Sequence, residues 1–253
     1  MNAAALSGSD FAVIGGTGMN QWPGLEIERR LAAETPFGAP SAPLLLGRVG
    51  AARAWFLARH GEGHKLPPHA INYRANLWAL HAQGVQRVVA IAAVGAIAEW
   101  FTPGEIALPE DLIDYTWGRE HSFSDGREGS ALRHVEFTQP YSPQLREQLR
   151  SAAARCQVTV AGAGVMAVTQ GPRLETAAEI RRLRRDGADM VGMTGMPEAA
   201  LAAELGMDYA CLAVSVNWAA GVKGLGDIHA EIAQSVELGM RKVRAVLAAM
   251  LDA

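Results

Sequence analysis

The chain has 253 residues, 49% of them hydrophobic and 19% charged, a balance typical of one folded α/β domain. The formal net charge is −3, and the Lys and Arg residues are dispersed, which argues against a nucleic-acid partner. No apolar run has the length of a membrane helix, and residues 1–10 lack the features of a secretory signal. Cys156 and Cys211 have neither metal nor redox spacing, so we expect two reduced thiols in a cytoplasmic protein, with Cys211 in the core.

Short β-like runs alternate with amphipathic helices along the chain. Apolar runs predict strands at residues 11–14, 54–58, 88–97, 105–108, 158–169 and 209–216. Helical spacing of apolar residues, with Gly and Pro at several ends, predicts helices at residues 72–83, 175–185, 198–205 and 229–251. The segment 115–141 is rich in Gly, Ser, His and charged residues, which indicates a long functional loop. The pattern predicts a single α/β domain over residues 1–253.

A glycine-rich loop, Gly15-Gly16-Thr17-Gly18, follows the first predicted strand. Glycines allow backbone N–H groups to converge on an anion, and the Thr17 hydroxyl adds a donor. The loop lacks the Lys-Ser/Thr ending of a Walker loop, and its glycines do not have the dinucleotide-binding spacing. On these residues alone, an anion site and a simple tight turn are equal alternatives.

Arg59 and His60 follow the second predicted strand, at the end of the strand where ligands of α/β sheets bind. Arg can hold a phosphate bidentately, and His can donate a further hydrogen bond. Without a partner motif, a solvated Arg and a structural His are the stronger interpretation. A metal-dependent hydrolase built on His60, Glu62, His64 and His69 is another hypothesis, although their spacing matches no standard zinc pattern.

Asn217 follows the last predicted strand, and an amide there can pair with a ring nitrogen or a carbonyl of a ligand. A turn-forming Asn is the alternative. Met193 and Thr194 could equally be a core residue and a helix cap, and Glu175 could be the first-turn acid of a helix. None of these residues identifies a function by itself.

Together these segments resemble the purine nucleoside phosphorylase and methylthioadenosine phosphorylase family over nearly the whole chain. The motifs that carry the resemblance stand in the family's order: Ile14-Gly-Gly-Thr-Gly18, Ala58-Arg-His-Gly61 with Asn72-Tyr-Arg-Ala-Asn76, Gln170-Gly-Pro-Arg-Leu-Glu-Thr176, and Gly187-Ala-Asp-Met-Val-Gly-Met-Thr194 with Met196-Pro-Glu198. The resemblance implies a single α/β domain with a central mixed β-sheet flanked by helices, assembled as a homotrimer or a dimer of trimers. It also implies inorganic phosphate as a co-substrate, with no metal or organic cofactor.

The resemblance further implies a phosphate site and a nucleoside site. The residues expected to line the phosphate site are Thr17, Arg59, His60, Ala92, Ala93 and Thr194. Methylthioadenosine-type members commonly have Thr at the position of Ala92, so one hydroxyl contact to phosphate is absent. The residues expected to bind the nucleoside are Met193, Glu175, Asn217, Trp218, Ala219, His229 and His134. Among them, Met193 packs on the ribose, and relatives lend the residue matching His134 to a neighbouring subunit's pocket.

The base pocket resembles that of the members acting on 6-oxopurines. Members acting on 6-aminopurines have Asp at the positions of Asn217 and Ala219 and Ser at that of Glu175. A 6-oxopurine offers N1–H to the Glu175 carboxylate and O6 to the Asn217 amide, whereas adenine leaves one buried group unpaired. We therefore expect phosphorolysis of inosine, guanosine or S-methyl-5′-thioinosine. Glu175 and Asn217 are the expected catalytic pair, with Asn217 stabilising the charge that develops on the departing base.

The group at the 5′ position of the sugar stays open. His229 resembles the His of members that bind a 5′-hydroxyl, whereas residues 217–221 resemble bacterial S-methyl-5′-thioinosine phosphorylases. A His can hydrogen-bond a hydroxyl, but a thioether prefers apolar walls. The alternatives that remain are an S-methyl-5′-thioadenosine phosphorylase, a metal-dependent hydrolase, a non-catalytic nucleotide-binding module and a hydrolytic nucleosidase.

Overall fold

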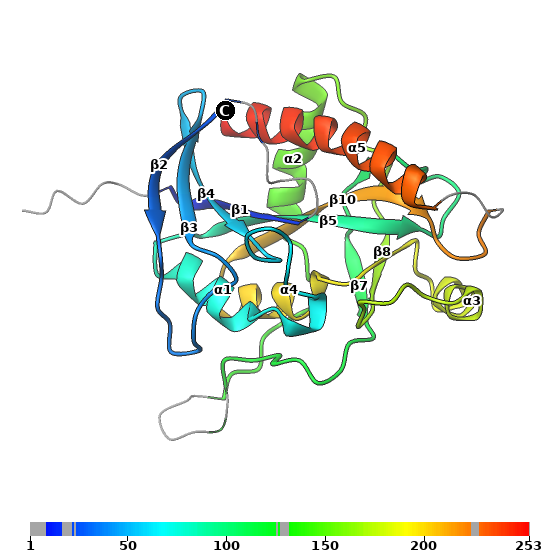
Figure 1. The fold of residues 1–253 in the computed structure, drawn as a ribbon, viewed down its shortest axis with the longest axis horizontal. Coiled ribbons are helices and arrows are strands. Elements are labelled where there is room, and N and C mark those ends of the chain that lie inside the picture. The colour runs from blue at the N-terminus through cyan, green and yellow to red at the C-terminus, as the bar shows by residue number, and fades with distance from the viewer. Residues whose placement is uncertain are drawn as a thin grey trace, which may run out of the picture.

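Strand β5 (Arg87–Ala96) is buried along almost its whole length, and the rest of the fold is arranged around it (Figure 1). One edge of β5 pairs in parallel with β1 (Phe11–Gly15), and the other edge pairs in parallel with β10 (Asp208–Trp218). Its small and β-branched residues suit a strand that has helices on both faces. The computed structural model describes residues 9–16, 22, 24–124, 126, 132–223 and 228–252, with the backbone alone at 228–231.

The described strands form one mixed sheet of ten strands. Outward from β1 the order is β4 (Ala52–Ala58), β3 (Leu44–Val49) and the charged edge strand β2 (Leu25–Leu31). Beyond the end of β1, the same edge of β5 pairs with β9 (Met190–Gly192), which is followed outward by β8 (Val165–Val168) and β7 (Asp111–Asp114). Strand β6 (Ile106–Ala107) pairs with β10. Because β1, β4, β5 and β10 are parallel, their carboxyl ends point the same way.

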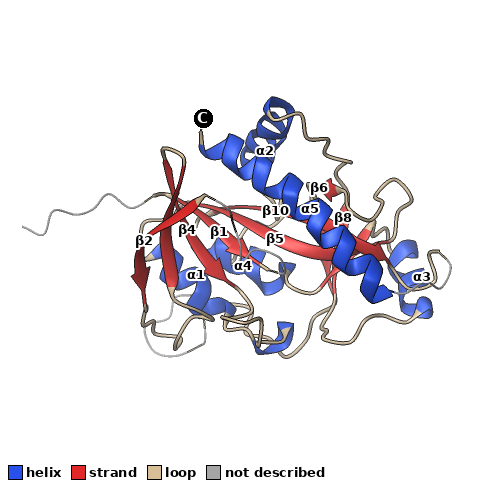
Figure 2. Ribbon diagram, turned by 45° about the horizontal axis from the view of Figure 1, so that its top comes forward, coloured by secondary structure: helices blue, strands red, loops and turns tan. Residues whose placement is uncertain are grey.

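Helices cover both faces of the sheet (Figures 1 and 2). On one face lie α2 (Pro143–Arg155) and α5 (Ile228–Leu251), and on the other lie α1 (Tyr73–His81) and α4 (Gly195–Glu204). Helix α3 (Ala177–Arg185) packs against β8 and β9, and a short 3-10 turn, η1 (Pro68–Ala70), precedes α1. Successive side chains of β1 alternate between the two cores, with Ala12 and Ile14 facing α1 and α4 and with Phe11 and Val13 facing α2 and α5.

Most of the predicted elements are present. The strands expected at 11–14, 54–58, 88–97 and 209–216 are β1, β4, β5 and β10, and the four expected helices are α1, α3, α4 and α5. The strands expected at 105–108 and 158–169 are present only as the shorter β6 and β8. Strands β2, β3, β7 and β9 and helix α2 were not predicted from the sequence. The described part of 115–141 holds no helix or strand, and Cys211 is buried as predicted. No helix in the described ranges has the length and apolarity needed to cross a membrane.

Candidate active site

A pocket of about 530 Å³ lies where the sheet divides along one edge of β5. Strand β1 pairs with β5 as far as Ala90, and β9 begins to pair only at Gly95. The described strands therefore leave residues 91–94 without a strand partner on that edge. The pocket occupies this gap, next to the carboxyl ends of β1, β4, β9 and β10. Such a point, where neighbouring strands of an α/β sheet diverge, is where ligands bind.

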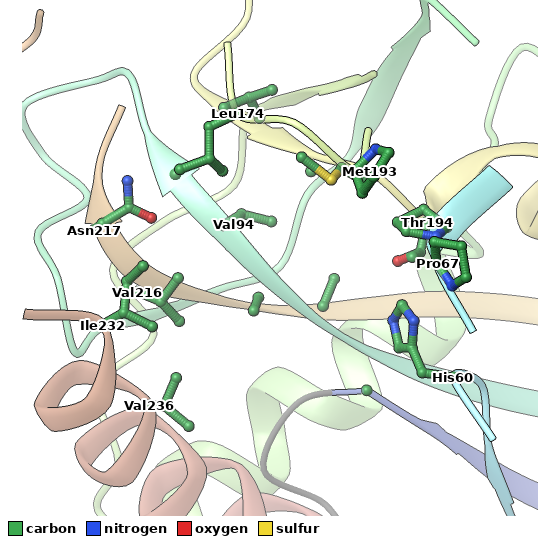
Figure 3. Close-up of a pocket in the computed structure, with 18 of the residues that line it drawn as sticks. His60, Pro67, Val94, Leu174, Met193, Thr194, Val216, Asn217, Ile232 and Val236 are labelled. Carbon is green, nitrogen blue, oxygen red and sulfur yellow. The ribbon is translucent and has the colours of Figure 1, made fainter. Parts of the chain in front are cut away.

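The pocket brings together most of the predicted site residues, from segments far apart in the sequence. Those that line it are Arg59, His60, Ala92, Ala93, Glu175, Met193, Thr194, Asn217 and Ala219. Figure 3 shows His60 and Thr194 at one end of the pocket, Asn217 at the other, and Met193 between them. The predicted phosphate and base residues thus occupy opposite ends of one cavity.

Four predicted residues are not among those lining the pocket. Thr17 lies outside the described residues, and so does the side chain of His229. His134 is exposed on the long loop and does not line the pocket of its own chain. Trp218 is also absent from the lining and instead holds Lys223 Nζ 4.0 Å from the centre of its ring. A bulge between Ser215 and Asn217 shifts the pairing of β10 with β5, and strand alternation then takes the residue after Asn217 away from the pocket.

At the predicted phosphate end, Arg59 is only 1% exposed and is held by the carboxylate of Glu198, which has no predicted role. Nε and Nη2 of Arg59 each donate to one oxygen of Glu198 at 2.7 Å, and Nη1 donates to the carbonyl of Ile91 at 3.0 Å. Glu198 is fully buried and also accepts a hydrogen bond from the Tyr209 hydroxyl at 2.8 Å. Glu198 therefore neutralises Arg59, and only the remaining N–H groups of Nη1 and Nη2 are available to an anion.

Gly16 leaves the space that the Arg59 guanidinium occupies. A Cβ atom at position 16 would lie 3.2 Å from Nη1 of Arg59 and 3.1 Å from the carbonyl oxygen of Ile91. Any side chain there would press on the hydrogen bond between these two groups. Gly16 thus contributes to the site through close packing on Arg59.

His60 has a defined protonation state. Its Nδ1 lies 2.8 Å from the carbonyl oxygen of Leu66, so Nδ1 carries the proton and donates it. The pKa of His60 is lowered to about 4, mainly by burial and in smaller part by the nearby Arg59 and His64, against the opposing effect of the Leu66 carbonyl. The ring is therefore neutral at pH 7, and Nε2 is an acceptor. In this state Nε2 offers the pocket an acceptor, whereas the sequence predicts a donor.

At the base end, Glu175 precedes α3 and does not cap it. Thr176 is the N-cap residue, and Glu179 completes the capping box, so Glu175 is not the first-turn acid of the helix. One carboxylate oxygen of Glu175 accepts a hydrogen bond from the Thr169 hydroxyl at 2.7 Å. Nδ2 of Asn217 donates to the Trp218 carbonyl at 2.7 Å, which leaves one amide N–H and the amide oxygen for a ligand.

The residues of the metal hypothesis do not form a metal centre. Within the described ranges, no group of three or more His, Cys, Asp or Glu side chains could hold a metal ion. Glu62 pairs with Arg30 at 2.6 Å, and the ring of His60 stacks against that of His64 with centroids 4.3 Å apart. His60, Glu62, His64 and His69 therefore do not converge on a common point.

Comparisons with known proteins agree with this geometry. Residues 10–252 match the family model described as the Phosphorylase superfamily. The chain is 50% identical over 244 residues to the Probable S-methyl-5′-thioinosine phosphorylase of Pseudomonas syringae pv. tomato, covering 96% of this chain and 98% of that one. It is 43% identical over 248 residues to the 6-oxopurine nucleoside phosphorylase of Pyrococcus furiosus, with coverages of 95% and 91%. A methylthioadenosine phosphorylase from an Antarctic soil metagenomic library superposes with a TM-score of 0.89 at 32% identity, covering 97% of this chain and 86% of that one.

The mixed sheet, its flanking helices and the pocket at the division of β5 define an α/β enzyme of the nucleoside phosphorylase type. The chain belongs to the phosphorylase superfamily, as its motifs predict.

Proposed function

We propose that the enzyme cleaves 6-oxopurine nucleosides by phosphorolysis in purine salvage, and that S-methyl-5′-thioinosine is its preferred substrate. The products are the free purine and 5-methylthioribose 1-phosphate. The observation that carries the proposal is one cavity that Glu175 lines and that has Asn217 at one end and His60 and Thr194 at the other (Figure 3). The names of the relatives from Pseudomonas syringae and Pyrococcus furiosus support the choice of base. The free thiols of Cys156 and Cys211 suit a reducing compartment, and we place the enzyme in the cytoplasm.

The reaction needs only groups that the pocket can supply. A phosphate oxygen forms a bond to C1′ of the sugar while the bond from C1′ to the purine nitrogen breaks. The electron pair of that bond leaves with the purine, which then takes up a proton. The free amide N–H of Asn217 stabilises the negative charge on the departing base, and Glu175 accepts the N1–H of a 6-oxopurine. The proposed reaction requires no metal and no organic cofactor.

The wall near Asn217 favours a methylthio group at the 5′ position. Val216, Ile232 and Val236 line this part of the pocket, the last two from α5 (Figure 3). An apolar wall gains about 0.8 kcal/mol for each buried CH₂ group, whereas these three side chains offer no hydrogen-bond partner to a hydroxyl. The relative from Pseudomonas syringae is named for a 5′-methylthio substrate, which points the same way.

The proposal predicts that cleavage depends on phosphate. We expect S-methyl-5′-thioinosine, inosine and guanosine to yield a sugar 1-phosphate only when phosphate is present, with kcat/KM highest for S-methyl-5′-thioinosine. Adenosine and S-methyl-5′-thioadenosine should react at least about 100-fold more slowly, because their N1 meets the Glu175 carboxylate as an acceptor. Chromatography of base and sugar products measures both effects. Undiminished turnover without phosphate would indicate a nucleosidase, and equal rates for adenosine would overturn the base assignment.

We also propose that the enzyme is a homotrimer in which His134 completes a neighbour's pocket. His134 is exposed, and Trp117 and Leu132 on the same loop are 71% and 76% exposed, an apolar surface suited to a second copy. We expect a trimer by light scattering and a loss of specific activity on dilution below the dissociation constant. The variant His134→Ala should raise KM for the nucleoside without dissociating the trimer. A monomer with full activity would contradict this assembly.

A further inference from the structure

Arg119 lies on the long loop that follows β7, and only 9% of it is exposed. All three nitrogens of its guanidinium donate hydrogen bonds. The acceptors are Gln170 Oε1, the Tyr73 hydroxyl, and the carbonyl oxygens of Thr169, Gln170, Met193 and Met196. Arg119 forms no ion pair with any described carboxylate, and it does not line the pocket. Its charge is therefore stabilised mainly by four backbone carbonyls, an arrangement that orders the segments supplying them.

One of these segments carries the base-binding carboxylate. Arg119 Nη2 donates to the carbonyls of Thr169 at 3.2 Å and of Gln170 at 2.9 Å. The hydroxyl of the same Thr169 donates to Glu175 at 2.7 Å. The position of the Glu175 carboxylate thus depends on a residue whose backbone Arg119 holds.

The other segment carries the ribose and phosphate residues. Arg119 Nη1 donates to the carbonyl of Met193 at 2.9 Å and also to that of Met196. Between these two carbonyls lies Thr194, which lines the phosphate end of the pocket and is the N-cap residue of α4. A shift of this segment would move Met193 and Thr194 together.

The two segments also touch each other, so their separation is closely defined. A Cβ atom at Gly171 would lie 2.5 Å from Sδ of Met193, and Gly171 has a φ of 60°, which favours glycine. The guanidinium donates hydrogen bonds to carbonyls on both sides of this contact. One side chain therefore fixes the base-binding segment against the ribose-binding segment.

We propose that Arg119 is a positioning residue that sets the distance between the base-binding and phosphate-binding halves of the site. This inference rests on the proposed function, because it assigns those two halves to base and phosphate. Loss of the Arg119 side chain should impair both halves at once, although Arg119 does not line the pocket. A residue that only stabilises the fold would instead lower the amount of folded enzyme and leave its KM values unchanged.

The test compares Arg119→Met with Arg119→Lys and with the control Arg173→Met. Arg173 lies on the same base-binding segment but is 69% exposed and pairs with Glu179 outside the pocket. For folded Arg119→Met, we expect KM for phosphate and for inosine each to rise about tenfold, and the preference for inosine over adenosine to fall by a similar factor. Arg119→Lys should show a smaller change, because Lys keeps the positive charge but lacks the planar guanidinium with its several N–H donors. Arg173→Met should resemble wild type.

A second variant separates positioning from folding. Arg119→Ala leaves room for free guanidinium, and a low, non-denaturing concentration of guanidinium chloride should restore part of the lost inosine preference. Unchanged KM values and base preference in folded Arg119→Met would overturn the inference, and so would the absence of rescue. If the wild-type enzyme shows no phosphorolysis, the proposed function fails. In that case, calorimetric binding of hypoxanthine and of phosphate to wild type and Arg119→Met still decides whether Arg119 positions both sites.

Discussion

Replacing Glu198 with Ala is expected to lower the free energy of unfolding by about 3–5 kcal/mol, because the change leaves a buried guanidinium without its counter-charge. Glu198 and Arg59 are 0% and 1% exposed, and two hydrogen bonds of 2.7 Å join them. Water cannot take the place of the carboxylate at such a depth. The Tyr209 hydroxyl also loses its acceptor. Denaturation by urea, followed by tryptophan fluorescence, measures the difference from wild type.

The matched control is Glu147→Ala, which removes an acid from an exposed ion pair with Arg150 at 3.1 Å. That change should cost less than about 1 kcal/mol. Glu198→Gln provides a second comparison, because it keeps the shape of the side chain but removes its charge. Phosphate should stabilise Glu198→Gln more than wild type, since a bound anion supplies the missing negative charge. Equal effects of Glu198→Ala and Glu147→Ala would contradict the buried pair.

Elements with a strong pattern could be predicted from the sequence. Strand β5 has a long continuous apolar run, and helix α5 has a long repeat of apolar residues at helical spacing. Their composition and spacing therefore identified one as a strand and the other as a helix. Helix α2 also has a start signal in the sequence, namely Ser142 as N-cap followed by Pro143. Strand β9 has three residues and β7 has four, which are too few to establish a period. Strand β2 was not predicted because it is an exposed edge strand with several charged residues, so it has no apolar run.

The overestimated strand at residues 158–169 has a backbone explanation. Gly164 has a φ of 141°, and a Cβ atom there would lie 2.6 Å from the Asp189 carboxylate. The chain before it meets residues 106–110 through an isolated bridge at Val160 and through separate backbone hydrogen bonds to the carbonyls of Gly162 and Gly164, and β8 starts only at Val165. An apolar run shows that a segment is buried, but it does not show where regular pairing begins.

The sequence motifs predicted the residues that line the site but not the residues that hold them in place. Each motif supplied residues that meet in the pocket, but the partners that hold them came from elsewhere in the sequence. Glu198 is 139 positions from Arg59, and Arg119 is on a loop with no recognisable pattern. Such pairings arise from the tertiary fold, so local spacing carries no sign of them. Trp218 lies outside the pocket lining for a related reason, because a single bulge in β10 decides which residues face the pocket.

Asn217→Asp is expected to cost inosine cleavage about 2–4 kcal/mol of transition-state stabilisation, or roughly 30- to 1,000-fold in kcat/KM, while adenosine cleavage is spared. Asn217 is 7% exposed, so water would screen a carboxylate there poorly. Nδ2 now donates to the Trp218 carbonyl at 2.7 Å, and a carboxylate oxygen in that place would face another acceptor. Its second oxygen would face O6 of a 6-oxopurine, which is also an acceptor.

A 6-amino group changes this balance, because it donates a hydrogen bond to the new carboxylate. Glu175 is unchanged and still requires a donor at N1, so the variant should lose inosine without becoming an efficient adenosine enzyme. Asn217→Ala is the control, since it removes the donor without adding charge and should slow both nucleosides alike. Steady-state kinetics of wild type and both variants on inosine and adenosine decide the matter. If Asn217→Asp cleaves inosine as well as wild type does, the amide cannot be the group that stabilises the departing base, and the developing charge must be met by another donor in the pocket.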